Sequence, residues 1–383
     1  MVYKKKDLIT LVAVGDVSPN RDDPPSIFRY CGDLFRTADI VFGQMENPIS
    51  DKGSPTILIA KNSRRLPPKN VTALTEEGAG FDVMSTACNH CMYYGWEAFF
   101  DWHDILRRNN IAVTGSGKNI EEARRPVILE RQGTRVGFLA YLSIARTDLT
   151  WAEKDLPGAA PLRADTFYKQ LRLEDPGSPP LIITKLFPED REAMEEDIKK
   201  LRPNVDVLVV SMHCGISGRP VLIAMYQKEA AYAAIDAGAD LVLQHHAHIL
   251  KGIEVYKGKV IFYGLGVFAS EHWLVPGGAA DDSRHMLKSK ELRHKPIPGY
   301  EKWKHPYDAL KTMAVKAYIQ GKKIQKVTYI PAYITSDLEP EVLTRKDPRA
   351  QEVFEYVVKI SESEDLKSNF SWDGDEVLVS DGE

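Results

Sequence analysis

Residues 207–215 read VLVVSMHCG and residues 241–248 read LVLQHHAH. Each stretch opens with a run of β-branched and apolar residues that is typical of a buried strand, and histidine follows each run. The stretch from Phe81 to His90 has the same plan, because the run around Val83 leads into Cys88-Asn89-His90. In an α/β sheet the loops after the strands share one edge of the molecule, so these polar groups are expected to converge although they lie far apart in the sequence.

Acidic residues earlier in the chain extend this pattern. The apolar run from Leu8 to Val14 is followed by Gly15-Asp16, and the run from Ile40 to Phe42 is followed by Glu46-Asn47. Carboxylates, amide oxygens and neutral imidazoles are ligands for divalent ions such as Mn, Fe or Zn. The sequence therefore predicts a metal site at this edge of the sheet.

The histidines after the last strand strengthen that prediction. His246 and His248 are two residues apart, and an extended His-x-His sequence projects both rings to the same face. Histidines elsewhere are expected to be ordinary polar residues, namely His272, His285, His294 and His305. We expect two divalent ions, held by the following ligands: Asp16, Glu46, Asn89, His213, His246 and His248.

The order of predicted elements indicates an α/β protein. Strands are expected near residues 8–14, 39–43, 82–86, 110–113, 126–130, 135–142, 206–212, 241–244 and 259–263, and the clearest helices near 96–108, 189–201 and 226–237. We expect one domain over residues 1–335, with insertions at 145–187 and 270–310. Residues 336–383 are expected to form a helical extension and an acidic tail that is solvated from Ser361 onward.

The motifs, taken in order, resemble those of the CapA/PgsA family of poly-γ-glutamate capsule biosynthesis proteins, within the calcineurin-like metallophosphatase superfamily. The resemblance covers roughly residues 8 to 270. It rests on these segments: Gly15-Asp16-Val17 with Arg21, Glu46-Asn47-Pro48, Phe81 through His90, Gly115-Ser116-Gly117, His213-Cys214-Gly215, His246-Ala247-His248, and Ile261 through Phe268. It implies a four-layer sandwich, in which two packed mixed sheets are flanked by helices.

The chain departs from the family pattern at several positions. Gln244 replaces a glycine, and Ser18 stands where metallophosphatases carry a histidine. The acidic residue that usually follows the Asn-His motif falls near Tyr93. The missing histidine at Ser18 predicts that one metal site is weaker or open.

The resemblance implies metal-assisted hydrolysis of an amide or peptide-type bond in an anionic, glutamyl-like substrate. His90, next to the ligand Asn89, is the expected general acid. Three alternatives stay open: a phosphoesterase, a metal-dependent epimerase, and a non-catalytic accessory protein of polyglutamate synthesis.

Basic residues are expected to recognise the anion. Seven Lys or Arg and only two acidic residues lie between Arg284 and Lys304, although a run of charge is also typical of a solvated face. The candidate substrate-binding residues are Arg21, Arg219, Arg284 and Arg293.

Composition sets the limits of this interpretation. The chain has 383 residues and a net charge of -4, which disfavours general nucleic-acid binding. No apolar run is long enough for a membrane span, so a cytoplasmic location is expected. Cys88 and Cys91 form a Cys-x-x-Cys pair that is also found in redox and zinc sites; we expect thiols near the ligands that are sensitive to oxidation.

Overall fold

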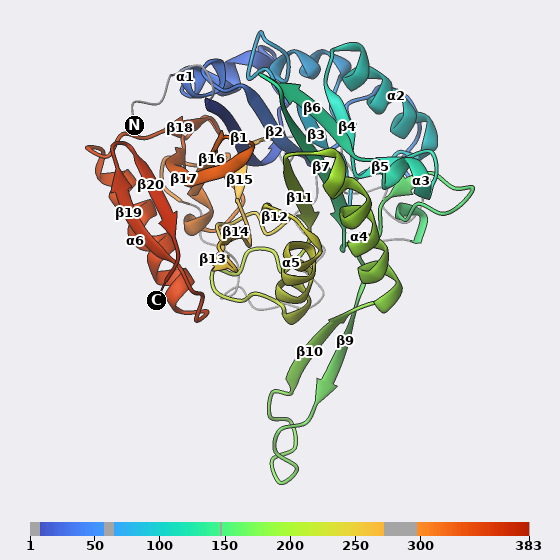
Figure 1. Ribbon diagram of the computed structural model, residues 1–383, viewed down its shortest axis with the longest axis vertical. Helices are drawn as coiled ribbons and strands as arrows, with labels where there is room; N and C mark the ends of the chain where they lie inside the picture. Colours follow the sequence, from blue (N-terminus) through green and yellow to red (C-terminus); the bar gives the residue numbers. More distant parts are fainter. Residues whose placement is uncertain (1–7, 57–64, 146–147, 272–296, 383) are drawn as a thin grey trace.

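The computed structural model describes residues 8–56, 65–145, 148–271 and 297–382. Two large sheets dominate this part of the chain (Figure 1). The larger has ten strands in the order β19-β20-β17-β16-β1-β2-β3-β4, with β15 paired to β1 and β18 paired to β17. Its strands are β1 (Leu8–Ser18), β2 (Ile40–Met45), β3 (Val83–Ser85), β4 (Ala112–Thr114), β15 (Val267–Ser270), β16 (Lys311–Gln320), β17 (Lys323–Ile334), β18 (Pro340–Val342), β19 (Asn369–Asp373) and β20 (Glu376–Ser380).

The second sheet has six strands in the order β13-β14-β12-β11-β7-β6. Its centre is parallel, because β11 pairs in parallel with both β7 and β12, whereas β6 and β13 are antiparallel edge strands. The strands are β6 (Val127–Arg131), β7 (Thr134–Leu142), β11 (Val207–His213), β12 (Leu241–His245), β13 (Ile253–Tyr256) and β14 (Lys259–Phe262). The nine strands expected from the sequence are therefore all present.

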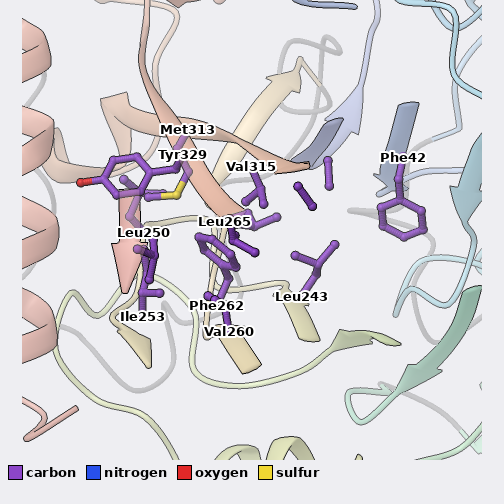
Figure 2. Close-up of a cluster of buried hydrophobic side chains, with 14 of the residues drawn as sticks. Phe42, Leu243, Leu250, Ile253, Val260, Phe262, Leu265, Met313, Val315 and Tyr329 are labelled. Atoms are coloured by element: carbon purple, nitrogen blue, oxygen red, sulfur yellow. The ribbon is translucent and has the colours of Figure 1, made fainter. Parts of the chain in front are cut away.

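The two sheets pack face to face through a shared apolar core. Phe42 on β2 stacks on Phe138 on β7, with ring centroids 5.5 Å apart. Figure 2 shows part of this core, to which Leu243 and Phe262 of the six-stranded sheet and Met313 and Val315 of the ten-stranded sheet all contribute. Alternate residues of each strand point away from this layer and meet the helices outside, as the period of two in a strand requires.

Helices cover the two outer faces of the sandwich. They are α1 (Gly32–Arg36), α2 (Gly95–Arg108), α3 (Ile120–Ala123), α4 (Pro188–Leu201) and α5 (Met225–Ala237), whereas α6 (Pro348–Glu362) packs its buried face on the core shared by the two sheets. In α2 the residues Phe99, Trp102 and Leu106 form one buried face against the ten-stranded sheet. Helices α4 and α5 pack on the six-stranded sheet. The expected α/β fold with two packed mixed sheets between helices is confirmed.

Short 3₁₀ helices complete the described elements. They are η2 (Pro24–Phe28), η3 (Pro68–Ala73), η4 (Asp148–Thr150), η5 (Arg202–Asn204) and η9 (Tyr307–Leu310). A small ladder joins β5 (Ser116–Gly117) to β8 (Gly158–Ala159), and β9 (Ala164–Lys169) pairs with β10 (Leu181–Leu186). The β9–β10 hairpin lies within the first expected insertion and projects from the body of the molecule in Figure 1.

The C-terminal region differs from the expected solvated tail. A helix is present as α6, but the residues after it form β19 and β20, which extend the ten-stranded sheet through β17. Val377 and Val379 are buried there, whereas the intervening and flanking residues are polar or partly exposed. The solvated tail is predicted from the acidic composition, which does not reveal that buried and exposed residues alternate along these strands.

Among the described residues, no helix combines the length and the apolar character that a membrane span requires.

Candidate metal centre

Asp16 lies where β1 passes between two neighbouring strands. The pairing of β1 with β15 and with β2 shifts register at this point, and the Asp16 N–H donates to the Gly266 carbonyl at 3.0 Å. Gly15 is needed for this approach, because a Cβ at Gly15 would lie 2.1 Å from the Gly266 oxygen. The tight crossing buries the Asp16 side chain between the two sheets.

Glu46 is the centre of the cluster, because three predicted site histidines approach its carboxylate. The Nε2 atom of His248 is 3.0 Å from Oε1, and the Nε2 atom of His90 is 3.3 Å from the same oxygen. The Nε2 atom of His213 is 3.6 Å from Oε2. The Glu46 side chain is fully buried, so these contacts take place away from bulk water.

His213 links Glu46 to the other predicted ligands. Its Nε2 atom lies 2.9 Å from the amide oxygen of Asn89 and 3.2 Å from Nδ1 of His246. His213 ends β11, whereas Asn89 lies in the turn after β3. The predicted convergence of strand-end residues from both sheets is therefore present for all six predicted ligands.

The prediction of an extended backbone for the His-x-His segment is wrong. Strand β12 ends at His245, and both His246 and His248 have left-handed backbones, with φ of 81° and 54°. Such conformations are unfavourable for residues with a side chain and cluster at functional sites. The two rings nevertheless lie close, with centroids 5.8 Å apart, because the chain turns sharply instead of extending.

His90 differs from the buried ligands in its exposure. Its side chain is 14% exposed, and its ring packs edge-on against Tyr93 with centroids 4.6 Å apart. Tyr93 occupies the region where the family pattern has an acidic residue, so an aromatic contact holds the His90 ring. This places an imidazole between the buried carboxylate of Glu46 and the surface.

Burial and mutual repulsion set the charges of the cluster. Burial, together with the nearby Glu46 carboxylate, raises the pKa of Asp16 well above its usual value. Burial also favours neutral Glu46, but the surrounding histidines, His213 first, outweigh it and hold the pKa of Glu46 well below its usual value. Burial lowers the pKa of His213 in turn. Despite burial, the Glu46 carboxylate raises the pKa of His248. Metal ions bind ionised carboxylates and neutral imidazoles, so metal binding would favour the release of protons from Asp16 and His248.

The residues present fit a divalent ion. One ligand atom each from Asp16, Glu46 and His213 lie within 4.8 Å of one another. Both Asp16 oxygens, Oε2 of Glu46 and Nδ1 of His213 are buried with no hydrogen-bond partner among the described residues. Buried polar atoms are nearly always paired, and a cation would pair the carboxylate oxygens here.

The predicted substrate-binding arginines differ in their surroundings. Arg21 is mostly buried, and its guanidinium forms ion pairs with Glu271 at 2.8 Å and Glu339 at 2.6 Å. Arg219 is exposed in the loop after β11, and its carbonyl accepts a hydrogen bond from Lys251. The remaining two candidates, Arg284 and Arg293, lie outside the described residues.

Sequence reasoning missed two histidines. His245 is buried beside Asp16, with its Nδ1 atom 4.0 Å from Oδ1 of Asp16, and burial lowers its pKa to about 3. His305, expected to be an ordinary polar residue, packs against His248 with ring centroids 5.1 Å apart, and Trp303 packs on His305. For His245 the signal was its position at the end of an apolar strand; for His305 the sequence held no comparable signal.

The cysteines near the cluster are buried thiols. All four cysteines in the chain are free and buried. Burial raises the pKa of Cys88 well above its usual value and that of Cys91 to about 12, so both stay protonated. This disfavours the expected sensitivity to oxidation, which requires an accessible thiolate. Within the described residues, the one group of three that meets the metal-site geometry contains no cysteine.

A hollow lies elsewhere on the surface. It has a volume of about 650 Å³, and Tyr232, Tyr256 and Lys367 form part of its wall. None of the predicted ligands lines it, so the chemistry of the side chains, more than the size of the hollow, identifies the candidate centre.

Comparison with known sequences gives a consistent set of relatives. The sequence model described as bacterial capsule synthesis protein PGA_cap matches residues 10–272. The chain is 27% identical to the capsule biosynthesis protein CapA of Bacillus anthracis, over 70% of this chain and 61% of that protein. It is 26% identical to the PGA biosynthesis protein CapA of Bacillus subtilis, over 76% of this chain and 71% of that protein. The match thus spans less than two thirds of the Bacillus anthracis protein.

Two further similarities complete the comparison. A probable polyglutamine synthesis accessory protein of Mycobacterium tuberculosis is 30% identical over 53% of this chain and 48% of that protein. Among solved structures, the calcineurin-like phosphoesterase YfkN of Bacillus subtilis aligns with a TM-score of 0.40 and 12% identity, over 93% of this chain and 98% of that chain.

Proposed function

The chain belongs to the family of bacterial capsule synthesis proteins, and from this premise we propose that it is a dinuclear metal-dependent hydrolase. The bond attacked is an amide or peptide-type bond in an anionic, glutamyl-like substrate. The observation that carries the proposal is the buried group of Asp16, Glu46 and His213, whose ligand atoms lie within 4.8 Å of one another and include unpartnered carboxylate oxygens.

The residues that would hold the ions divide around Glu46. His248 approaches Oε1 of Glu46 and lies 3.8 Å from Oδ2 of Asp16, whereas His213, which contacts Asn89 and His246, approaches Oε2 of Glu46. Glu46 is therefore the proposed bridge. When bound, divalent ions of Mn, Fe or Zn supply Lewis acidity that polarises a carbonyl or phosphoryl group and activates water.

His90 is the proposed general acid. Its ring lies at the edge of the cluster, 3.3 Å from Glu46 and partly exposed, so it can face both the centre and an entering substrate. The edge-on contact with Tyr93 fixes the ring plane. From this position Nε2 would deliver a proton to the leaving nitrogen as the bond breaks, a role worth about a hundredfold or more in rate.

Arg219 is the proposed contact to the anionic part of the substrate. The N–H of the preceding residue, Gly218, donates to the Ala247 carbonyl at 2.8 Å, which ties this loop to the His246–His248 segment. The exposed guanidinium can thus reach a carboxylate that approaches the cluster.

A cytoplasmic location is likewise a proposal, and cell fractionation tests it.

A second candidate function is an accessory role in polyglutamate synthesis without catalysis. The name of the Mycobacterium tuberculosis relative favours it, because that protein is described as a probable synthesis accessory protein. The two candidates differ in what the cluster must do. A hydrolase needs bound metal and turnover, whereas an accessory protein needs neither.

Metal analysis joined to an activity screen tests the proposal. The purified protein should contain about two divalent ions per chain and should cleave γ-glutamyl amides faster than phosphoesters. His90→Asn should keep its metal and lose turnover about a hundredfold. A protein that binds divalent ions but cleaves no substrate would favour the accessory role. Racemisation of chiral peptides without cleavage would instead indicate an epimerase.

A further inference from the structure

His245 is the last residue of β12, and its ring faces the layer between the two sheets. It lies beside His213 in the parallel pairing of β12 with β11, and its ring centroid is 6.4 Å from that of Phe42. Its Nδ1 atom is 4.0 Å from Oδ1 of Asp16, too far for a hydrogen bond. The side chain is fully buried and none of the predicted metal roles includes it.

Neither ring nitrogen of His245 has a hydrogen-bond partner among the described residues. A buried polar group without a partner is destabilising. Both carboxylate oxygens of Asp16, which face His245, also lack a hydrogen-bond partner among the described residues. The imidazole and the carboxylate could form a hydrogen bond with each other, but they lie too far apart. The gap indicates that a third group belongs between them.

Another buried histidine shows that this is not a general property of the chain. His103 on α2 is as deeply buried as His245, but its Nε2 atom lies 2.9 Å from the hydroxyl of Ser116. The fold therefore provides a partner for a buried imidazole where the imidazole is structural. His245 lacks such a partner, and it lies beside a carboxyl group that lacks one as well.

A cation fits this gap better than an anion. The carboxyl group of Asp16 lies beside His245, and the ionised, buried carboxylate of Glu46 in the same cluster would repel an anion. Ser18 cannot take this role, because its hydroxyl lies 2.9 Å from the Asn47 amide oxygen and is buried there. An imidazole nitrogen paired with carboxylate oxygens is a donor set for Mn, Fe, Co or Zn.

We propose that His245 is a further ligand of the divalent ion held by Asp16. Ser18 stands where metallophosphatases carry a histidine two residues after the first aspartate, and His245 would supply the nitrogen ligand that Ser18 lacks. The inference rests on the metal centre of the proposed function and not on the substrate or the bond that is cleaved. It predicts a nitrogen-rich site at Asp16 that selects a transition metal over Mg.

Cobalt titration of the metal-stripped full-length protein tests the inference. His245→Phe removes both nitrogens while it keeps an apolar ring in the core, and His103→Phe is the matched control. We expect His245→Phe to lose about tenfold to a hundredfold in affinity for one of the two ions, a loss at least as large as that for an outer-shell partner. His103→Phe should bind Co²⁺ as the wild type does.

A spectroscopic count separates a ligand from a neighbour. Each histidine bound to Co²⁺ gives a strongly shifted ring N–H signal in the proton NMR spectrum, and the wild type should show one more such signal than His245→Phe. An equal count with reduced affinity would mean that His245 only orients Asp16, and it would overturn the inference. His245→Asn repeats the test if the phenylalanine variant does not fold.

The outcomes also separate this inference from the proposed function. If the wild type binds Co²⁺ and His245→Phe gives the same affinity and the same spectrum, His245 is not a ligand but the metal centre stands. If the wild type binds no divalent ion at all, the proposed function and this inference fail together.

Discussion

Two groups of buried charges lie at the carboxyl end of β1, and they differ in how well their polar atoms are paired. Arg21 forms ion pairs with Glu271 and Glu339, and its Nη2 atom also donates to the Asp337 carbonyl at 2.8 Å. Asp16, a few residues earlier, has no hydrogen-bond partner for either oxygen among the described residues. One group is complete within the chain, and the other is not.

This difference separates structural charge from functional charge. A buried ion pair that is fully hydrogen-bonded holds segments together and leaves no site for a ligand. A buried carboxylate that lacks a partner costs free energy unless something binds it. We therefore expect substitutions of Arg21 and its partners to change the free energy of unfolding. Substitutions of Asp16 and its neighbour Glu46 should instead change metal binding.

The largest effect is expected from Arg21→Ala. It leaves Glu271 buried without an ion-pair partner and Glu339 with only the half-exposed Arg29, which should lower the free energy of unfolding by about 3–5 kcal/mol. Urea denaturation measures the loss, and metal content should not change. Arg29→Ala is the control, because Arg29 also pairs with Glu339 but is 52% exposed; its cost should stay below about 1 kcal/mol. If Arg21→Ala loses metal and keeps its free energy of unfolding, Arg21 belongs to the metal site and not to the structural ion pairs.

Glu46→Gln should have the opposite profile. The amide keeps the shape of the side chain but removes the charge that His213 and His248 approach, so we expect affinity for divalent ions to fall by more than about a hundredfold, beyond the loss seen for outer-shell partners. Competition with a chelator measures the affinity. Metal content equal to that of the wild type would remove Glu46 from the proposed site.

A pH series on His103 sharpens the comparison between paired and unpaired groups. Burial lowers the pKa of His103 to about 3, whereas an unfolded histidine titrates near 6.5. Because the folded pKa is depressed, the stability contribution of neutral His103 is complete above about pH 6.5 and is lost as pH falls toward 3. Between these values the slope of unfolding free energy is about 1.4 kcal/mol per pH unit for each such group.

His103→Phe should remove that share of the slope in urea denaturation at pH 7, 6 and 5. The metal-stripped protein is the sample for this series, because bound metal would add its own pH dependence. Identical slopes in the variant and the wild type would show that the folded pKa of His103 equals that of an unfolded histidine.

The sequence was sufficient to predict that the candidate ligands lie close together, because strand ends can be recognised locally. The runs before Asp16, Glu46 and His213 are short and apolar, and parallel packing brings the residues after them together. Side-chain pairing could not be predicted in the same way. Arg21 was expected to meet a substrate, but it pairs with Glu339, a residue more than three hundred positions away that no local pattern links to it.

The same limit applies to backbone detail. The sequence indicated that His246 and His248 act together, but not that both adopt left-handed conformations after the strand ends. It also hid β19 and β20, because the charged residues in the last segment outweigh the few apolar residues that the sheet buries. Local patterns gave the elements, and long-range contacts determined how their polar atoms are satisfied.

The smallest effect on the folded protein is expected from Arg219→Ala. The side chain is exposed and makes no ion pair among the described residues, so the free energy of unfolding should change by less than about 0.5 kcal/mol. Metal content should also be unchanged. If Arg219 binds the anionic part of the substrate, KM should rise several-fold with little change in kcat, because such a contact binds the ground state and the transition state alike. Arg219→Lys should recover part of the loss, whereas an unchanged KM in both variants would leave anion binding to Arg284 and Arg293.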